Sequence, residues 1–211
     1  MALGATFARP MRCRRLIRCQ GCGLSDSLCL CSSLPQLAPR TRVIVLAHRI
    51  ELTKSTNTGR LVARMLPERA RLEQSHCWEP AADVLPHAHS FVLFPSDDAQ
   101  PLEAVAAEVQ TLIIPDGTWA QSRRMARRQA HCRDLPKVRL SDTPHSAYAL
   151  RRSAVQSGLC TLEAAVHALR VLEPELGAER MLEAFARWVQ RALLVRAGAH
   201  DMRQERIAAL D

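Results

Sequence analysis

Residues 111–119 read Thr-Leu-Ile-Ile-Pro-Asp-Gly-Thr-Trp, and they join a short apolar run to a basic segment of helical composition. The apolar run at 111–114 is continuous and rich in β-branched residues, which is the pattern of a strand buried on both faces. The segment at 119–131 reads as a helix. A polar turn between a buried strand and a helix is typical of α/β folds, in which ligands bind beyond the carboxyl ends of the strands.

The same alternation of strand and helix covers most of the chain. Strands are predicted at 42–47, 91–94, 111–114 and 137–140, and helices at 58–66, 101–109, 119–131, 161–172 and 179–196. This pattern predicts an α/β fold with a mostly parallel sheet that is covered on both faces. The last helix carries an apolar stripe, which we expect to serve the core rather than a partner: Leu182, Phe185, Val189 and Leu193.

Composition places the chain among soluble globular proteins. Its 211 residues suffice for one large domain or for a small module and a main domain, and 47% of them are hydrophobic. No apolar run approaches the roughly 18–20 residues of a membrane span. Residues 1–18 are rich in arginine but lack the continuous apolar segment of a secretory signal. We expect a cytoplasmic protein, and a mitochondrial presequence is the alternative for this segment.

The chain is basic, with a formal net charge of +8. Such an excess attracts polyanions, although an arginine-rich composition can also reflect genomic base content. Part of the charge has a definite place in the predicted helix at 119–131. Four arginines form two i,i+4 pairs on one side of that helix: Arg123, Arg124, Arg127 and Arg128. We predict that they contact RNA phosphates.

Four of the eight cysteines lie within thirteen residues, in the order Cys19-x-x-Cys22-x6-Cys29-x-Cys31. Zinc prefers four soft ligands in a tetrahedron, and a closed site of four thiolates is structural because no position is left for substrate. A redox Cys-x-x-Cys is the alternative, which the two further cysteines disfavour. The other cysteines are scattered and are predicted to be buried or inert thiols: Cys13, Cys77, Cys132 and Cys160.

Polar clusters follow the predicted strands at 48–60, 94–97, 114–119 and 146–164. Asp116 at a strand end, beside a flexible Gly117 and the flat indole of Trp119, suits a pocket for a planar base with a proton acceptor. The threonines and asparagine at 56–58 precede a helix whose free N–H groups can hold a carboxylate or phosphate. Ordinary structural roles are the alternatives: capped turns in the other clusters, and Asp116 as a helix N-cap with Trp119 in the core.

The motifs taken together, in their order along the chain, are a more specific indication of a protein family than any single motif. It comprises the four cysteines, Thr-Asn-Thr-Gly-Arg at 56–60, Phe-Pro-Ser at 94–96, Asp-Gly-Thr-Trp at 116–119, Ser-x-Tyr-x-Leu-Arg at 146–151 and Thr-x-Glu-Ala at 161–164. In this order, from residue 19 to about residue 172, the chain resembles the DTW-domain family of tRNA-uridine aminocarboxypropyltransferases. One position departs from the family pattern, since Cys160 stands where Ser is common and is a poor hydrogen-bond donor.

The resemblance implies a SPOUT-like fold with a C-terminal knot. It also implies S-adenosylmethionine as donor of a 3-amino-3-carboxypropyl group and N3 of the uridine at tRNA position 47, in the variable loop, as acceptor. The modified product would be acp3U, with methylthioadenosine released. We expect three parts of the chain: an N-terminal arm and zinc module at 1–36, a catalytic domain at 40–198 and a polar tail at 199–211.

Roles can be assigned to single residues on this basis. Asp116 would accept or polarise the uridine N3 proton, so that the nitrogen attacks the methionine Cγ in line. The remaining predicted donor-binding residues are Thr58, Gly59, Arg60, Ser96, Trp119, Tyr148, Leu159 and Thr161. Two other functions stay open, namely a SPOUT-like RNA methyltransferase with the same cofactor and a non-catalytic zinc-containing RNA-binding protein.

Overall fold

The structure is a computed structural model that describes residues 16–76, 89–142, 146, 148, 150 and 158–198. The predictions for Cys13, Cys77 and the tail at 199–211 lie outside the described residues, as does most of the N-terminal arm. Among the described residues, no helix combines the length and the apolarity needed to cross a bilayer.

Within the described residues, six strands form one parallel sheet. They are β1 (Arg42–Ala47), β2 (Ala70–Gln74), β3 (Ser90–Leu93), β4 (Gln100–Pro101), β5 (Thr111–Asp116) and β6 (Lys137–Arg139), in the spatial order β2-β1-β5-β3-β6-β4. Every pairing between neighbours is parallel. The predicted α/β fold with a mostly parallel sheet is therefore confirmed, whereas the C-terminal knot stays a prediction.

The helices form after most strands, as the alternation predicts. They are α1 (Arg49–Leu52), α2 (Gly59–Met65), α3 (Trp119–Arg128), α4 (Ala130–Arg133), α5 (Thr161–Leu172) and α6 (Glu179–Arg196), with short 3-10 helices η1 (Asp26–Leu28), η3 (Leu102–Glu108) and η4 (Pro174–Leu176). Two predictions differ in detail. The segment at 101–109 forms η3 instead of an α-helix, and the segment at 119–131 is divided into α3 and α4 because Gln129 is extended.

The two faces of the sheet bury different hydrophobic clusters. On β1, Val43 and Val45 belong to the larger cluster, which includes residues of α2, α5 and α6. The intervening Ile44 and Leu46 belong to the smaller cluster, which includes residues of α3 and α4. This alternation follows from the two-residue period of a strand and explains why the predicted strands lack polar positions.

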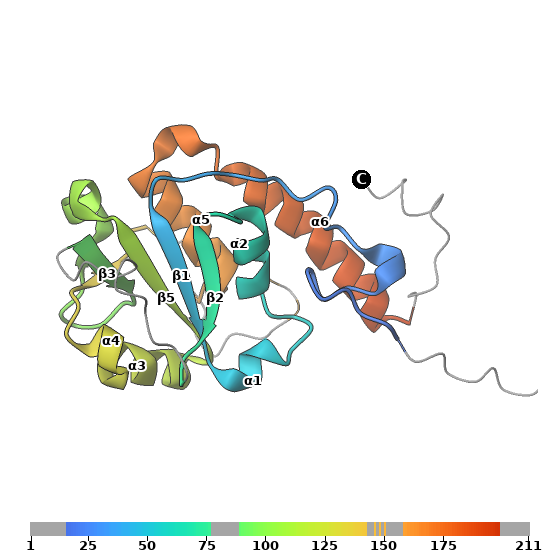
Figure 1. Ribbon diagram of the computed structural model, residues 1–211, viewed down its shortest axis with the longest axis horizontal. Coiled ribbons are helices and arrows are strands. Elements are labelled where there is room, and N and C mark those ends of the chain that lie inside the picture. The colour runs from blue at the N-terminus through green and yellow to red at the C-terminus, as the bar shows by residue number, and fades with distance from the viewer. Residues whose placement is uncertain are drawn as a thin grey trace, which may run out of the picture.

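The segment that carries the four cysteines packs against α6 (Figure 1). The indole Nε1 of Trp188 donates to the carbonyl of Cys22 at 2.8 Å. Leu24 and Leu28 of the cysteine segment are buried in the same cluster as Phe185 and Val189 of the predicted stripe. Leu182 of that stripe is half-buried, whereas Leu193 is exposed. The cysteine segment and one face of the sheet thus share a continuous core, and the predicted domain boundary at 36–40 stays a prediction.

Candidate active site at the carboxyl edge of the sheet

Asp116 is the last residue of β5, between β1 and β3 in the sheet. The backbone of Asp116 is in register with Ala47 of β1, and its carbonyl accepts a hydrogen bond from the N–H of His48 at 2.9 Å. Parallel strands end at the same edge, so the loops after β1 and β3 lie beside this residue. The structure thus places Asp116 where α/β folds bind their ligands.

The carboxylate of Asp116 joins three segments of the chain. Its Oδ2 accepts from Asn57 Nδ2 at 2.6 Å, and its Oδ1 accepts from the Thr161 hydroxyl at 2.6 Å. Asn57 Oδ1 accepts from the N–H of Arg60 at 2.9 Å, and this contact fixes which side of the amide faces Asp116. The Asp116 side chain is therefore built into the start of α2 and the start of α5, and the residue is only 5% exposed.

Thr118, and not Asp116, is the N-cap of α3. The Thr118 hydroxyl accepts from the N–H of Gln121 at 3.3 Å, and Gln121 Oε1 accepts from the N–H of Thr118 at 2.8 Å. This reciprocal capping box satisfies the start of the helix locally. The alternative in which Asp116 caps the helix is thus wrong, and its carboxylate faces the loops of α2 and α5 instead.

Gly59 begins α2 in direct contact with the carboxylate. A Cβ at this position would lie 2.7 Å from Val45 Cγ1 and 3.0 Å from Asp116 Oδ2, which is too close for any larger residue without movement. Thr58 precedes it and is buried, but its side chain makes no capping hydrogen bond. The cap is supplied by Asn57, and its amide therefore serves both the helix and Asp116.

Arg60 is turned toward the loop that precedes α2. Its Nη2 donates to the carbonyls of Leu52 at 3.1 Å and Lys54 at 3.3 Å. From the first turn of α2, the guanidinium thus holds the beginning of the loop that precedes this helix. The predicted contact between Arg60 and a donor carboxylate stays a prediction.

Further polar contacts hold the start of α5, next to Thr161. Glu163 is 4% exposed, and its Oε2 accepts from the N–H of Cys160 at 2.8 Å and from the Ser146 hydroxyl at 2.6 Å. Burial raises the pKa of the Cys160 thiol above its ordinary value, so this thiol is protonated at neutral pH. The acidic side chain at 163 caps the helix, and the departure from Ser to Cys160 leaves that cap in place.

The aromatic side chains predicted for the site occupy two different environments. Trp119 is half-buried beside the smaller cluster, with its ring centroid 6.0 Å from that of Phe94. Tyr148 is buried against Phe185 of α6, and its hydroxyl donates to the carbonyl of Thr56 at 2.7 Å. Tyr148 and Trp119 therefore pack on opposite faces of the sheet, and Tyr148 contacts the loop before α2.

Ser96 and Leu159 complete the predicted set. Ser96 follows β3, where its N–H donates to the carbonyl of Phe94 at 2.9 Å in a tight turn. Leu159 is half-buried and directly precedes the N-cap of α5. Both residues lie in loops at strand or helix ends that face the same edge of the sheet, and their contact with a donor stays a prediction.

Residues that sequence reasoning did not assign to the site also lie there. Asn57 donates to Asp116 Oδ2, and Glu163 accepts from the N–H of Cys160, the residue before Thr161. His48 and His76 follow the adjacent strands β1 and β2, and their ring centroids are 6.0 Å apart in an edge-to-face arrangement. The sequence feature that could have pointed to Asn57 is its position between two threonines, two residues before Gly59, where α2 begins.

Basic side chains line a hollow on α3, the helix that directly follows the Asp116 turn. The hollow has a volume of about 460 Å³ and is lined by Ala120, Arg123, Arg124, Arg127 and Arg128. All four arginines are exposed. The predicted grouping on one side of a helix is thus present, and its contact with RNA stays a prediction.

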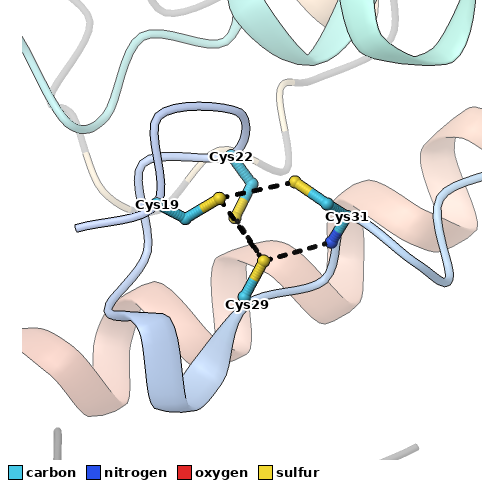
Figure 2. Close-up of side chains that lie close together, drawn as sticks. All are labelled: Cys19, Cys22, Cys29 and Cys31. Atoms are coloured by element: carbon cyan, nitrogen blue, oxygen red, sulfur yellow. Dashed lines mark hydrogen bonds between the residues drawn. The ribbon is translucent and has the colours of Figure 1, made fainter.

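The sulfur atoms of Cys19, Cys22, Cys29 and Cys31 converge, as Figure 2 shows. All four lie within 4.8 Å of one another, and the contacts include 3.4 Å between Cys29 and Cys19 and 3.8 Å between Cys22 and Cys29. Four sulfurs around a tetrahedral zinc, each about 2.3 Å from the metal, are about 3.8 Å apart. The four side chains therefore fit a structural zinc ion, and their spacing is too long for disulfide bonds.

The thiols of Cys19, Cys22 and Cys31 differ in pKa. Burial raises the pKa of Cys22 above its ordinary value and that of Cys31 to about 11. Burial acts in the same direction at Cys19, but N–H donors from Cys22 and Gly21 together with neighbouring thiols outweigh it and lower the pKa of Cys19 to about 7. A divalent cation favours the thiolate form of all its ligands, so metal binding would release protons here.

Known proteins resemble this chain in sequence. The tRNA-uridine aminocarboxypropyltransferase 2 of Drosophila melanogaster is 28% identical over 172 residues, which cover 75% of this chain and 68% of that protein. The enzyme of the same name from Macaca fascicularis is 28% identical and is covered over 58% of its length. The tRNA-uridine aminocarboxypropyltransferase A of Arabidopsis thaliana is 26% identical over 193 residues.

A solved structure shares the fold. It is the SAM-dependent rRNA:acp-transferase Tsr3 from Vulcanisaeta distributa, with a TM-score of 0.50 and 20% identity, covering 82% of this chain and 85% of that one. The DTW domain matches residues 16–193, a range that includes the four cysteines, Asp116 and most of α6. The resemblance derived from the motifs is confirmed, and the chain belongs to the DTW domain family.

Proposed function

We propose that this protein is a tRNA-uridine aminocarboxypropyltransferase that moves the 3-amino-3-carboxypropyl group of S-adenosylmethionine to N3 of a tRNA uridine. The observation that carries the proposal is the Asp116 carboxylate, which ends a central strand and is held by Asn57 and Thr161 at the starts of two helices. The names of the relatives from fly, macaque and Arabidopsis support aminocarboxypropyl transfer to a tRNA uridine.

The reaction needs few chemical groups from the protein. The uridine N3 gives up its proton and attacks the Cγ atom of the donor, a new N–C bond forms, and the C–S bond of the sulfonium breaks. The electron pair of that bond stays on sulfur, so methylthioadenosine leaves as a neutral molecule. Holding the nitrogen and the Cγ atom in line supplies most of the acceleration, because the two reactants are then no longer free to diffuse.

Asp116 would receive or polarise the N3 proton. The Asn57 amide and the Thr161 hydroxyl, both neutral groups, donate to this carboxylate and fix its orientation. An unperturbed aspartate is a weak base for an imide, and proton transfer would therefore accompany N–C bond formation rather than precede it.

The start of α5 is a suitable place for the donor. Thr161 is the first residue of this twelve-residue helix, and its hydroxyl touches Asp116. Free N–H groups and the positive end of the helix dipole favour a carboxylate such as that of the methionine moiety. Thr58, Gly59 and Arg60 would complete this site from α2, and Ser96, Trp119, Tyr148 and Leu159 would border it.

The arginines of α3 would hold the tRNA. This helix begins three residues after Asp116, and its arginine-lined hollow is open to solvent. Phosphate contacts of this kind position an RNA without reading its sequence. The variable-loop uridine at position 47 is the acceptor that the family resemblance implies, and we expect the protein to meet its tRNA in the cytoplasm.

The four cysteines would hold one structural zinc ion. A bound zinc would cross-link the segment that packs on α6, and four thiolate ligands leave no position for substrate. The chemistry is thus assigned to Asp116 and the donor, and the metal is given a structural role.

The experiment is to incubate the purified protein with S-adenosylmethionine and unmodified tRNA and to analyse the nucleosides by mass spectrometry. The proposal predicts an aminocarboxypropyl uridine that appears with the wild type and is absent with Asp116→Asn. A product mapped to the variable loop would support position 47. Unmodified tRNA after incubation with protein that binds both substrates would contradict the proposal.

A further inference from the structure

The cysteine segment touches the loop that carries Asn57. Gly23 lies between Cys22 and Leu24 and has a positive φ of 76°, which only glycine adopts without strain. A Cβ on Gly23 would lie 2.4 Å from the carbonyl oxygen of Ser55 and 3.4 Å from Arg60 Nη1. The backbone of the cysteine segment therefore rests directly on the backbone of the loop at residues 52–58, hereafter the α2 loop.

A second connection runs through α6. Trp188 donates from Nε1 to the carbonyl of Cys22 at 2.8 Å, and its ring centroid lies 6.3 Å from that of Tyr148. The ring of Phe185 stacks on Trp188 at 5.8 Å and also packs against Tyr148. The Tyr148 hydroxyl donates to the carbonyl of Thr56 in the α2 loop. The carbonyl of one metal-ligating residue and the α2 loop are thus joined by a buried aromatic cluster.

Hydrogen bonds connect the α2 loop to the Asp116 carboxylate. Arg60 holds the carbonyls of Leu52 and Lys54, and its own N–H donates to Asn57 Oδ1. The other side of the Asn57 amide donates to Asp116 Oδ2. A shift of the loop at residue 55 or 56 would therefore move the Asn57 amide away from the position in which it holds Asp116.

We propose that the four-cysteine segment is a positioning element of the Asp116 site, with Gly23 and Trp188 as its positioning residues. When the four thiolates are cross-linked by a metal, Gly23 and the Cys22 carbonyl are fixed, and the α2 loop is held in its binding-competent form. The affinity for S-adenosylmethionine then depends on the metal, although the metal and the donor do not touch. This inference rests on the proposed function, because it takes S-adenosylmethionine as the ligand.

The test compares two glycine variants of the full-length, zinc-loaded protein. Gly23→Ala places a methyl group against the Ser55 carbonyl, whereas Gly177→Ala imposes the same kind of strain at a φ of 68° with only flexible side chains nearby. Zinc content is measured for each protein, and affinity for S-adenosylmethionine is measured by calorimetry. We expect Gly23→Ala to keep its zinc and bind at least about fivefold more weakly, the lower end of ordinary coupling between sites. Gly177→Ala should bind as the wild type does.

Equal affinity in zinc-loaded Gly23→Ala and the wild type would overturn the inference. A second variant, Trp188→Phe, keeps an aromatic ring but removes the hydrogen bond to the Cys22 carbonyl. It should also bind S-adenosylmethionine more weakly than the wild type does. Absence of S-adenosylmethionine binding by the zinc-loaded wild type would instead contradict the proposed function.

Hydrogen exchange tests the same link without any variant or ligand. The N–H groups of Asn57 and Arg60 donate to Lys54 and Asn57 of the α2 loop, and the N–H of Lys54 donates to the carbonyl of Glu51 just before it. After removal of zinc by a chelator, with the protein still folded by circular dichroism, these amides should exchange faster, whereas amides in β5 should not. Unchanged protection in the α2 loop of the zinc-free protein would overturn the inference even if the variants do not fold.

Discussion

Asp116 is held by an amide and a hydroxyl that come from distant parts of the chain. Asn57 is 59 residues away and Thr161 is 45 residues away, and both contacts measure 2.6 Å. Neither of these two donors carries a charge, and both contacts reach the carboxylate that would face the uridine N3 proton in the proposed reaction. The same two contacts fix its orientation, which a reaction that depends on alignment requires.

Asp116→Asn is predicted to stop transfer and to preserve the fold. The new amide can accept from Asn57 with its oxygen and donate to the Thr161 hydroxyl with its nitrogen, so both contacts survive. Loss of the carboxylate should lower kcat by at least about 100-fold, the lower end for general-base residues. Single-turnover kinetics measure the rate, and calorimetry checks that donor affinity is retained.

A matched control is Asp134→Asn, which changes an exposed aspartate directly after α4 and should leave the rate unchanged. Normal turnover in the Asp116→Asn protein would remove this side chain from the role of proton acceptor. A loss of donor binding together with turnover would assign Asp116 to donor binding instead.

Sequence reasoning found Asp116 and Thr161 but not the amide that links them to α2. Asp116 stood out because a polar residue followed an apolar strand, a local signal that needs no knowledge of the fold. The contact from Asn57 depends on β1 lying beside β5, an order that alternating strands and helices do not specify. Asn57 was therefore predicted only to cap a helix, whereas it also binds the carboxylate of a distant residue.

At the scale of elements, the carboxylate of Glu173 fastens the end of α5 to the start of β1. Its two oxygens accept from the N–H groups of Arg40 and Thr41, each at 2.8 Å. Burial disfavours the charged form, but these two N–H donors outweigh it and hold the pKa of Glu173 below its ordinary value. The contact fixes where the central strand β1 enters the sheet.

Glu173→Gln is predicted to lower the free energy of unfolding by about 1–3 kcal/mol at pH 7, because one N–H donor then faces an amide N–H group. A lowered pKa in the folded state means that the wild-type contribution is present above about pH 4.3, the unfolded value, and is lost as the pH falls through the folded value. The difference between the two proteins should therefore narrow in acid. Urea unfolding at several pH values measures it.

The exposed Glu175 offers the control, since Glu175→Gln removes the same charge two residues away in η4. We expect that variant to match the wild type within about 0.5 kcal/mol. An equal loss of stability in both variants would mean that the loss of one negative charge, and not of the contact with Arg40 and Thr41, is responsible.

The basic side of α3 is predicted to bind tRNA. Arg123→Glu combined with Arg127→Glu should weaken tRNA binding at physiological salt and flatten its salt dependence by about one unit of slope for each phosphate that is no longer neutralised. Arg170→Glu with Arg180→Glu makes the same change in net charge on exposed positions of α5 and α6. If both double variants lose affinity equally, total charge and not the α3 surface controls binding.

Element boundaries show where sequence patterns reach their limit. The edge strand β2 was not predicted, because Arg71 and Glu73 interrupt its apolar residues, as is common at the edge of a sheet. The basic segment after Trp119 was predicted as one helix, but an extended Gln129 divides it. Nothing in the sequence around residue 129 is a helix breaker, so this division depends on packing against the sheet.

At the scale of the whole molecule, the candidate site lies at one edge of the sheet, between helices of opposite faces. The helices α2 and α5 bring Asn57 and Thr161 from the face with the larger cluster, whereas α3 brings its arginines from the other face. In the proposed function, this arrangement would bring the donor and the RNA to Asp116 from different faces of the sheet. The cysteine segment lies on the face of α2 and α5, against α6 (Figure 1).

The packing of the cysteine segment on α6 could not be read from the sequence. The spacing of the four cysteines predicted that their side chains converge, because Cys-x-x-Cys and Cys-x-Cys turns present thiolates to one ion. Their neighbours gave no sign of a partner, and Trp188 was not among the residues of the predicted stripe. A contact between Trp188 and Cys22, 166 residues apart, is visible only once the chain is folded.

The central claim, that the donor gives up its aminocarboxypropyl group, is tested most directly by the small product left behind. Wild-type protein, S-adenosylmethionine and tRNA are incubated together, and the nucleoside product is identified by chromatography and mass spectrometry. The account predicts methylthioadenosine in a one-to-one ratio with modified uridine, and none with Asp116→Asn. S-adenosylhomocysteine in its place would contradict the account and identify a methyltransferase.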